Sequence, residues 1–394
     1  MIIKSLLDSD FYKISMCQFA FHQYRTFKVA YRFVCRNKEV DLSSYADEIR
    51  NEINSLSLLH FTEDEIAFLR STDLMKEDFL DYLRSFQLNS DQIKVFVKDG
   101  QLKIEAEGIW CETILFEVLV LSIVNEVYFR NTQPNADKSV ALAKLYEKID
   151  LVKELNHYSE LHNYPLFKFI DFGTRRRFSS IWQGEIDEIL IKELPNNFIG
   201  TSSVYWAMKC GIRPVGTMAH EFLQFFQAVS PELKHFQRDA LFAWLKEYDG
   251  KISIALTDVI TTDAFFNDFG NVLTRAYSGL RHDSSDPFKW ADKVLEHYRK
   301  HAIDPKEHTL VFSDGLNFQK ARDLYLYTIK FTNPIFGIGT NLTNDYGFTP
   351  LNIVMKMIMA DGKPVAKISD EPSKSICDDN NFLNNLKVMF KVED

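Results

Sequence analysis

The sequence predicts an α/β protein whose second half carries a parallel sheet in a barrel-like arrangement, beside a smaller mixed part. From Phe167 onward, short apolar segments recur, each followed by a polar turn. Helix-like stretches separate several of them, and this alternation indicates βα units with parallel strands. Six or seven such units in about 180 residues favour a barrel over an open sheet. The segments are FKFIDFGTRRR, NNFIGTSS, IRPVGTMAHE, ISIALTDVITTD, YSGLRHDSSDP, TLVFSDGLN and PIFGIGTN.

Length and composition fit two folded domains. The chain has 394 residues, of which 46% are hydrophobic and 26% charged, a balance that excludes disorder, collagen and coiled coil as global descriptions. The formal net charge of -9 disfavours nucleic acid as the main partner. Local basic clusters still allow anionic small molecules as substrates.

The cysteines and the N-terminus indicate a cytoplasmic protein. The 5 cysteines are scattered without a CxxC pair, which favours a reducing compartment over a disulfide framework or a zinc site. The N-terminal MIIKSLLDSDFYK carries charges too early for a signal peptide. The most apolar stretch, Ile114–Phe129, is interrupted by Glu117, Asn125 and Glu126 and is too short for a membrane span. We therefore expect a buried helix there and no membrane partner.

Strand signals in the first part come from alternation and turn residues. Lys28–Arg36 alternates like a strand, and Ile93–Ile109 reads as a hairpin around Asp99-Gly100. A second hairpin is expected over Ile353–Ile368, turning at Asp361-Gly362. This hairpin is expected to return to the N-terminal sheet. The predicted domains are thus residues 1–165, joined by residues 351–394, and a barrel-like catalytic domain over residues 166–350.

Helix signals come from caps and periodicity. Thr62 and Glu65 form the pattern of a capping box, with Phe61 and Ile66 as the hydrophobic staple. Asp286 followed by Pro287 predicts another helix start. Three further helices are expected, over Glu112–Arg130, about Ala136–Tyr158, and LNFQKARDLYLYTIKF after Asp314-Gly315.

Three arginines, Arg175 to Arg177, follow the strand that ends at Asp171-Phe172. Arginines at a strand-to-helix junction suit bidentate binding of phosphate or carboxylate. The alternative is a solvated helix face on which they pair with Glu185 and Asp187. Cations at a helix N-terminus oppose the helix dipole, which favours the anion-binding interpretation.

His220 follows the segment PVGTMA and opens the apolar stretch FLQFFQAV. Its neighbour Glu221 either orients the imidazole or points away. A lone histidine is more often a satisfied core or surface residue than a catalytic one. The sequence has 10 histidines, and no HExxH-type spacing selects a metal site among them.

Carboxylates follow two strands at the expected catalytic edge. Asp258 and Asp263 come after one strand, and Asp283 and Asp286 after the next. Carboxylates together with substrate phosphates are the usual ligands of Mg²⁺. We assign Asp286 to helix capping and keep the other three as candidates.

The last strand of the barrel-like region ends in Gly337-Ile338-Gly339-Thr340. The two glycines let the backbone approach an anion, and the N–H groups can form a nest for phosphate. Barrels commonly bind phosphate on loops after their late strands. With Asp314-Gly315 after the preceding strand, the pattern favours a ribose phosphate or a similar ligand.

Taken in order, these segments resemble the nicotinate phosphoribosyltransferase family over essentially the whole chain. The resemblance is carried by LLDSDFYKISM, EAEGIWCETILFEV, FIDFGTRRR, FIGTSSV, PVGTMAHEF, LTDVITTDAF, YSGLRHDSSDP, VFSDGLN and FGIGTNLTND. Each string alone is weak, whereas their shared order and spacing are highly specific.

The resemblance implies a type II phosphoribosyltransferase fold, an incomplete α/β barrel packed on a smaller mixed α+β domain. It also implies transfer of the phosphoribosyl group from phosphoribosyl pyrophosphate to nicotinate, with Mg²⁺, in NAD salvage. In this family ATP hydrolysis is coupled to the transfer, in the manner of a ligase, through a phosphorylated histidine, which matches His220. The expected partners are therefore small molecules: nicotinate, phosphoribosyl pyrophosphate and ATP.

Further residue roles are implied by the resemblance alone. Phe172 and Tyr12 match the aromatic residues that sandwich the pyridine ring. In related enzymes this tyrosine comes from the neighbouring subunit, so a homodimer with a shared site stays open. Arg281 and Arg175 match positions near the ring carboxylate and the phosphates. The matches to the 5′-phosphate cradle are Gly315, Gly337, Gly339 and Thr340, and those to the ribose and pyrophosphate region are Asp258 and Asp283.

Ser202 separates substrate classes. Nicotinamide-using relatives carry an aspartate two residues after the glycine of the string that reads FIGTSSV here, and in this chain that position is Ser202. An aspartate accepts a bond from an amide but repels a carboxylate, whereas a hydroxyl can donate. The serine therefore favours nicotinate over nicotinamide. Quinolinate would need more basic groups than the pattern supplies.

Two other classes compete with a transferase. A sugar-phosphate aldolase or isomerase on a complete barrel would need a lysine or a Glu/His pair at strand ends, and the pattern offers no lysine there. A non-enzymatic ligand-binding regulator would keep the pocket and lose the nucleophile, and His220 argues against it.

Overall fold

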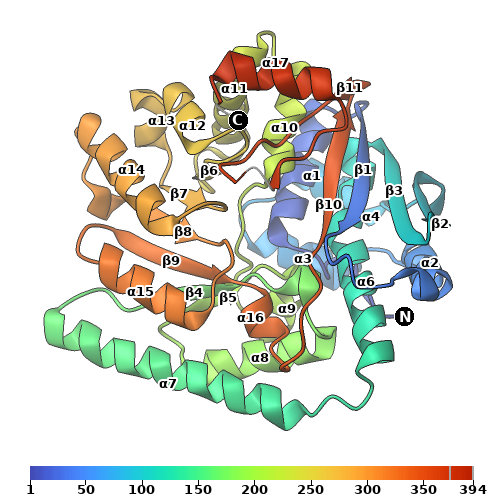
Figure 1. Ribbon diagram of the computed structural model, residues 1–394, viewed down its shortest axis with the longest axis horizontal. Helices are drawn as coiled ribbons and strands as arrows, with labels where there is room; N and C mark the ends of the chain where they lie inside the picture. Colours follow the sequence, from blue (N-terminus) through green and yellow to red (C-terminus); the bar gives the residue numbers. More distant parts are fainter. Residues whose placement is uncertain (372–373, 393–394) are drawn as a thin grey trace. The chain divides into compact units, whose positions relative to one another are not determined.

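The computed structural model describes residues 1–371 and 374–392 of the chain (Figure 1). Contacts divide the chain into two compact units, each assembled from three stretches. Unit 1 comprises Met1–Lys153, Ile170–Gly216 and Ile338–Lys356, and unit 2 comprises Glu154–Phe169, Thr217–Gly337 and Met357–Asp394. The domain boundaries after residues 165 and 350 stay predictions.

A six-stranded sheet has the order β5-β4-β9-β8-β7-β6. Its neighbours from β6 to β9 are parallel, with pairs such as Leu280↔Leu310 and Val311↔Ile335. In the described part of the chain, β5 and β6 are its two end strands, so the barrel is incomplete, as the resemblance implied. The strands are β4 Lys168–Asp171, β5 Phe198–Thr201, β6 Ile254–Leu256, β7 Gly279–His282, β8 Thr309–Phe312 and β9 Asn333–Ile338.

One expected strand before His220 is missing. The segment IRPVG forms only an isolated parallel bridge, Thr201↔Pro214. Proline has no N–H to donate, which removes a ladder bond at the centre of this short segment. His220 therefore follows a loop, and it is the first residue of helix α10, His220–Val229.

A separate five-stranded sheet has the order β11-β10-β1-β3-β2. The hairpin of β2 with β3 turns at Asp99 and Gly100, whose φ angles are 53° and 70°. The hairpin of β10 with β11 turns at Asp361 and Gly362, with φ angles of 48° and 74°. Both predicted hairpins are confirmed. The strands are β1 Lys28–Cys35, β2 Ile93–Lys98, β3 Gln101–Ile109, β10 Ile353–Ala360 and β11 Lys363–Pro364.

The capped helices begin where the sequence predicted. Helix α3, Glu63–Ser71, has the complete capping box of Thr62 and Glu65. Helix α14, Pro287–Lys300, is capped by Asp286, whose carboxylate accepts from the N–H groups of Phe288 and Lys289. The helix expected over residues 112–130 is instead two helices, α5 Trp110–Thr113 and α6 Phe116–Thr132.

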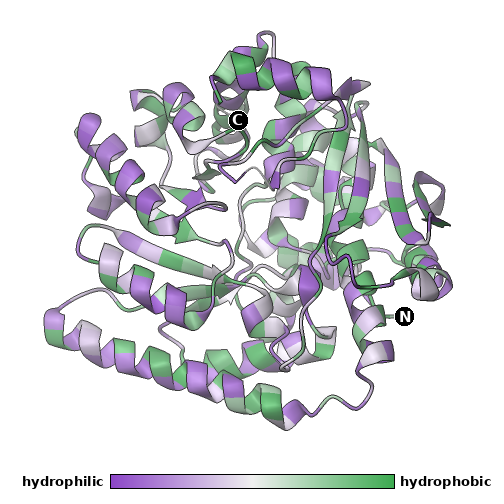
Figure 2. Ribbon diagram, viewed as in Figure 1, coloured by the Kyte–Doolittle hydropathy of each residue, from purple (hydrophilic) through white to green (hydrophobic). Residues whose placement is uncertain are grey.

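Helix α7, Lys138–His162, has its buried apolar residues along one face. Hydrophobic and hydrophilic residues alternate along it (Figure 2), and its buried apolar residues recur at helical spacing. Among the described residues no helix combines the length and apolarity that crossing a bilayer needs. The other helices are α1 Phe11–Gln23, α2 Ala46–Asn54, α4 Glu77–Arg84, α8 Ser180–Glu193, α9 Val204–Cys210, α11 Phe236–Tyr248, α12 Thr262–Asp268, α13 Asn271–Ala276, α15 Phe318–Thr328, α16 Thr340–Thr343 and α17 Asn380–Phe390.

Candidate functional site

Three carboxylates follow the parallel strands β6, β7 and β8 of unit 2. Asp258 lies two residues after β6, Asp283 directly after β7, and Asp314 two residues after β8. Because these strands are parallel, their carboxyl ends meet at one edge of the sheet. The sequence-predicted carboxylates therefore share an edge.

His220 is at the centre of a buried group of charges. Its Nε2 atom lies 2.8 Å from Asp258 Oδ1 and 2.8 Å from the Lys367 ammonium, and its Nδ1 atom lies 3.6 Å from Asp283 Oδ2. Only 7% of His220 is exposed. We call these four residues the His220 cluster. The structure thus brings together three residues that the sequence singled out separately.

The electrostatics of the His220 cluster keep the imidazole neutral. Burial and the nearby Lys367 ammonium lower the pKa of His220 to about 4, against the opposing effect of Asp258 and Asp283. Burial pushes the pKa of Asp258 upward, but Lys367 and His220 hold it well below its usual range. A neutral imidazole carries its N–H and its lone pair on different nitrogens. When Nε2 donates to Asp258, the lone pair is on Nδ1, which is then able to act as a nucleophile.

Lys367 is the member of this cluster that sequence reasoning missed. It lies beyond β11, and its backbone pairs with Ile376 as an isolated bridge. The ammonium lies 2.8 Å from Asp258 Oδ2, and the lysine is 4% exposed. The lysine absent from the strand ends is therefore supplied by a segment more than a hundred residues further along the chain, which no local pattern could reveal.

Arg281 of β7 flanks the His220 cluster, next to its member Asp283. Arg281 Nη1 donates to the Met218 carbonyl at 3.1 Å, and its buried Nε has no hydrogen-bond partner among the described residues. Burial raises the pKa of Asp283, but Arg281 and His220 together bring it below its usual value. Ser313 donates to Asp283 Oδ1 at 3.0 Å. Arg281 thus has donor capacity that the described structure leaves unused.

The other strand-end candidates of unit 2 divide into two groups. Asp314 pairs with Lys374 at 2.8 Å, and the following Gly315 has a φ angle of 56° with open space where a Cβ would stand. Asp263 instead lies on the first turn of α12, exposed and paired with Lys293 at 2.8 Å. Asp263 therefore lies outside the His220 cluster, whereas the assignment of Asp314 and Gly315 to an anion-binding loop stays a prediction.

The three consecutive arginines of unit 1 have three different environments. Arg177 is fully buried and bonded to Asp8 and Glu126, so the alternative of a solvated face is wrong for this residue. Arg176 donates to the Ile353 carbonyl at 3.1 Å. Arg175 keeps 42% of its side chain exposed and is the one arginine of the three that remains a direct ligand candidate.

Ser202 and Arg175 share a second group of charges, all in unit 1. Ser202 Oγ donates to Asp10 Oδ1 at 2.6 Å. Arg175 lies 3.9 Å from Asp10 and 3.7 Å from Glu117. We call Asp10, Glu117, Arg175 and Ser202 the Ser202 cluster. Its carboxylates were missed by sequence reasoning, although Asp10 lies in the string LLDSDFYK that carried the resemblance.

The two carboxylates of the Ser202 cluster have opposite net pKa shifts, although burial raises the pKa of both. Burial raises the pKa of Asp10, and Arg175 and Ser202 only partly offset it. Burial also raises the pKa of Glu117, but the ammonium of Lys13, 2.5 Å away, and then Arg175 bring it below its usual value. Lys13 is itself fully buried, with its ammonium 5.6 Å from the centre of the Tyr12 ring. Fixed charges therefore surround the segment that carries Tyr12.

The glycine loop after β9 approaches another loop of unit 1. A Cβ on Gly339 would lie 3.1 Å from the Phe172 carbonyl oxygen, so a larger residue would push on that backbone. Thr340 is the first residue of α16, and Lys148 bonds the Asn341 carbonyl at 2.5 Å. Gly339 and Thr340 thus form a tight turn next to Phe172. Gly337 belongs to β9 itself.

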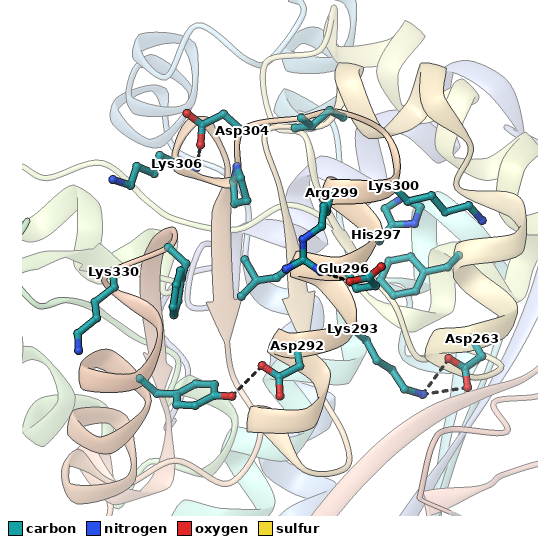
Figure 3. Close-up of a pocket in the computed structure, with 16 residues that line it drawn as sticks. Asp263, Asp292, Lys293, Glu296, His297, Arg299, Lys300, Asp304, Lys306 and Lys330 are labelled. Atoms are coloured by element: carbon teal, nitrogen blue, oxygen red, sulfur yellow. Dashed lines mark hydrogen bonds and ion pairs between the residues drawn. The ribbon is translucent and has the colours of Figure 1, made fainter.

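A separate pocket of about 1080 Å³ lies on unit 2 (Figure 3). Many of its lining residues, such as Asp304, Lys306, Lys330 and Phe331, precede β8 or β9, whereas the candidate site follows the strands. Two ion pairs lie along it, Lys293 with Asp263 and Arg299 with Glu296 (Figure 3). This pocket is therefore not the place where the candidate residues converge.

A divalent cation fits only part of the His220 cluster. Ligand atoms of His220, Asp258 and Asp283 lie within 4.8 Å of one another. Both oxygens of Asp258 are already bonded, one to His220 and the other to Lys367 and Ser284. Asp283 is 29% exposed at its side chain, and its Oδ2 lies 3.6 Å from the imidazole, beyond hydrogen-bond distance. Asp283 is therefore the better oxygen ligand for Mg²⁺ held mainly by phosphates.

Known proteins similar to this chain agree on one family. Residues 167–394 match the nicotinate phosphoribosyltransferase (NAPRTase) family, and residues 7–125 match the N-terminal domain of that family. The chain is 45% identical to a nicotinate phosphoribosyltransferase of Xylella fastidiosa, over 99% of this chain and 98% of that protein. It is 46% identical to the one of Burkholderia mallei, over 100% and 98%. A crystal structure of nicotinate phosphoribosyltransferase from Vibrio cholerae superposes with a TM-score of 0.94 at 40% identity, covering 100% of this chain and 95% of that one.

Proposed function

Because this chain belongs to the nicotinate phosphoribosyltransferase family, we propose that it joins nicotinate to the phosphoribosyl group of phosphoribosyl pyrophosphate, with ATP hydrolysis coupled through His220. The products are nicotinate mononucleotide and pyrophosphate, which makes this a step of NAD salvage in the cytoplasm. The observation that supports the coupling is the neutral imidazole of His220 between Asp258 and Lys367.

The aromatic contacts to the nicotinate ring are assigned to residues of unit 1. Phe172 and Tyr12 stack on the two faces of the pyridine ring, as aromatic rings prefer offset stacking. Ser202 tells the acid from the amide. Its hydroxyl hydrogen is committed to Asp10 in the present structure, so its contribution is the absence of a carboxylate as much as the presence of a donor.

The N-terminal segment that carries Tyr12 supports a pocket made within one chain. Three backbone hydrogen bonds join it to the segment after β5: Phe11 N to Ser202 O, Val204 N to Ser9 O and Tyr205 N to Leu7 O. We therefore expect no recovery of activity when Tyr12→Ala and His220→Ala subunits are mixed. Recovery would assign Tyr12 to the site of a partner subunit in a homodimer.

Phosphate and carboxylate binding are assigned to donors and glycines near strand ends. Arg281 has an unused buried Nε–H and serves the ring carboxylate, and Arg175 serves the phosphates. Asp314, Gly315, Gly337, Gly339 and Thr340 cradle the 5′-phosphate. Asp258 and Asp283 face the ribose and pyrophosphate. Asp283 would hold Mg²⁺ together with the substrate phosphates, and the ion would supply positive charge for the leaving pyrophosphate.

ATP coupling follows from the state of His220. The lone pair of a neutral ring nitrogen forms a bond to the γ-phosphorus of ATP, while the bond from that phosphorus to the β-γ bridging oxygen breaks and ADP leaves. Lys367 lies within hydrogen-bond distance of this imidazole and can neutralise charge on the phosphoryl group. Water later takes the phosphoryl group from the nitrogen, which completes ATP hydrolysis and restores the imidazole.

Product analysis tests this proposal. The protein is incubated with phosphoribosyl pyrophosphate, Mg²⁺ and one of nicotinate, nicotinamide or quinolinate, each with and without ATP. We expect nicotinate mononucleotide as the main product, with ADP released in step with it. A dominant product from nicotinamide or quinolinate would overturn the substrate, and product formation without ADP release would overturn the coupling.

A further inference from the structure

A buried polar network in unit 1 lies behind the residues assigned to the nicotinate ring. Its members are fully or largely buried and are joined by hydrogen bonds and ion pairs. We call it the Arg177 network; it consists of Asp8, Glu126, Asp171, Arg177, Gln183 and Thr201. None of these residues has a role in the reaction proposed above.

Arg177 is the hub of this network. Its Nη1 and Nη2 atoms bond the two carboxylate oxygens of Asp8 at 2.5 and 2.7 Å, and its Nε atom bonds Glu126 at 2.8 Å. Nη1 also donates to Gln183 Oε1 at 3.2 Å. A bidentate guanidinium–carboxylate pair fixes direction as well as distance, which an ammonium cannot do.

The network continues from Gln183 to Asp171. Gln183 Nε2 donates to Asp171 Oδ2 at 2.6 Å, and Thr201 Oγ1 donates to the same oxygen at 2.8 Å. The other oxygen of Asp171 accepts from the Gly173 N–H at 2.7 Å. One buried carboxylate therefore holds the loop after β4 and the end of β5 together.

Each member at the edge of the network adjoins a residue of the proposed ring pocket. Asp171 directly precedes Phe172, Thr201 directly precedes Ser202, and Asp8 lies in the same short segment as Asp10 and Tyr12. The Arg177 side chain is thus a buried connection between the segment of Tyr12 and the loop of Phe172, beside the contacts of Ser202 and Arg175 with Asp10. A change of about 1 Å in such spacing is enough to lose ring stacking or orientation.

We propose that Arg177 is a positioning residue of the nicotinate pocket, which sets the spacing of the Tyr12 segment and the Phe172 loop through its bidentate bond to Asp8. This inference rests on the proposed function, because it assumes that the ring binds between those two segments. It assigns to Arg177 a larger effect on nicotinate than on phosphoribosyl pyrophosphate, because most of the proposed phosphate cradle lies after β8 and β9 and only its Gly339 turn adjoins the Phe172 loop.

Arg177→Lys and Asp8→Asn test the inference singly and together. Both keep the approximate size of the side chain and remove the bidentate pair. We expect each single variant to raise the KM for nicotinate at least about fivefold, with the KM for phosphoribosyl pyrophosphate within about twofold of the wild type. The KM for nicotinate of the double variant should lie within about twofold of that of the more impaired single variant, because both changes remove the same interaction.

Arg130→Lys is the matched control. Arg130 lies on α6 with Glu126 and pairs with Glu48 and Glu52 at the surface, so the same substitution should leave both KM values within about twofold. All assays are run well below the melting temperature of each variant. A purely structural role would lower the active fraction and kcat but leave the KM for nicotinate unchanged.

The outcomes separate this inference from the proposed function. If the wild type makes no nicotinate mononucleotide, both fail. If the wild type is active and folded Arg177→Lys and Asp8→Asn keep the KM for nicotinate within about twofold, the inference alone is overturned. An equal rise in the KM for phosphoribosyl pyrophosphate would also overturn it. If Arg177→Lys does not fold, Asp8→Asn decides, since an asparagine oxygen can still accept one bond from Arg177.

Discussion

The His220 cluster of unit 2 and the Ser202 cluster of unit 1 are both buried groups of opposite charges, but they differ in what the charges act on. In the His220 cluster, a carboxylate and an ammonium bind the same ring nitrogen. In the Ser202 cluster, a serine bonds one carboxylate and an arginine stays half exposed at longer distances. The first arrangement sets the pKa of one imidazole, and the second leaves an arginine exposed beside two buried carboxylates.

This difference predicts different kinetic signatures for the two regions. Substitutions in the His220 cluster should alter the steps that involve ATP and therefore kcat and coupling. Substitutions in the Ser202 cluster and its neighbours should alter the KM for nicotinate and the choice among pyridine substrates.

His220→Asn should abolish ATP coupling. Asparagine keeps a similar size and hydrogen-bonding capacity but offers no nucleophilic nitrogen, so ADP release linked to product should fall at least about 100-fold. Transfer without ATP should survive at a lower rate, because the strands and phosphate loops remain. The measurement is the ratio of ADP to nicotinate mononucleotide, together with labelling from γ-³²P-ATP that is lost in acid and kept in base.

His297→Asn is the matched control for this variant. Burial also lowers the pKa of His297 to about 4, but its Nε2 atom bonds Thr274 and its ring stacks on Phe266 at 4.4 Å. Removal of His297 should therefore leave coupling unchanged. ADP release in step with product in His220→Asn, or a label on another residue, would make the assigned nucleophile wrong.

Lys367→Gln should move the pH dependence of coupling. In the wild type, His220 with its pKa of about 4 is neutral throughout the range above pH 5. Without the ammonium, Asp258 and Asp283 remain and favour the imidazolium, so the pKa rises and activity is lost as the pH falls through that higher value. We also expect a decrease of about 10-fold or more in coupled ATP hydrolysis at neutral pH.

The measurement is the rate of coupled ADP release between pH 5 and pH 8. The control is Lys293→Gln, whose exposed ammonium pairs with Asp263 outside the His220 cluster. That variant should keep the wild-type profile. If the rate of Lys367→Gln falls at the same acidic pH as that of the wild type, the lysine does not set the protonation of His220.

The strand ends show how far sequence reasoning reaches. Strand, polar loop and helix repeat locally, so six of the seven expected segments are strands and the fold class is confirmed. Asp258 and Asp283 were found because parallel strands bring successive strand ends to one edge. The strand predicted before His220 was wrong, since the proline in IRPVG limits this segment to a single bridge.

The missed residues share a physical reason. Lys367, Asp10 and Glu117 reach their partners across 109, 192 and 58 positions of sequence, respectively, and no periodic pattern encodes such pairings. Burial also separated arginines that look equivalent in sequence, since Arg177 is enclosed and Arg175 is half exposed. The sequence therefore located candidate chemistry, and the fold decided which neighbours act on it.

Ser202→Asp should shift substrate choice from nicotinate toward nicotinamide. The new carboxylate would stand next to Asp10, which now accepts from the serine at 2.6 Å, and it would repel the nicotinate carboxylate. We expect the ratio of kcat/KM for nicotinate over nicotinamide to fall about 10-fold. Ser202→Asn is the control, with a similar size and no charge, and it should change this ratio less. An unmoved ratio in Ser202→Asp would place specificity elsewhere in the pocket.

Phe172→Ala should give the smallest effect of the series. A ring stack adds about 1 kcal/mol beyond area burial, so its loss should raise the KM for nicotinate about fivefold or somewhat more. The ratio of ADP to product should stay that of the wild type, because the His220 cluster is untouched. Tyr146→Ala on α7 is the control, since that exposed aromatic residue of unit 1 has no assigned contact with substrate and should leave the KM unchanged. An unchanged KM in Phe172→Ala would remove this residue from the pocket, and a loss of coupling would break the division between the two regions.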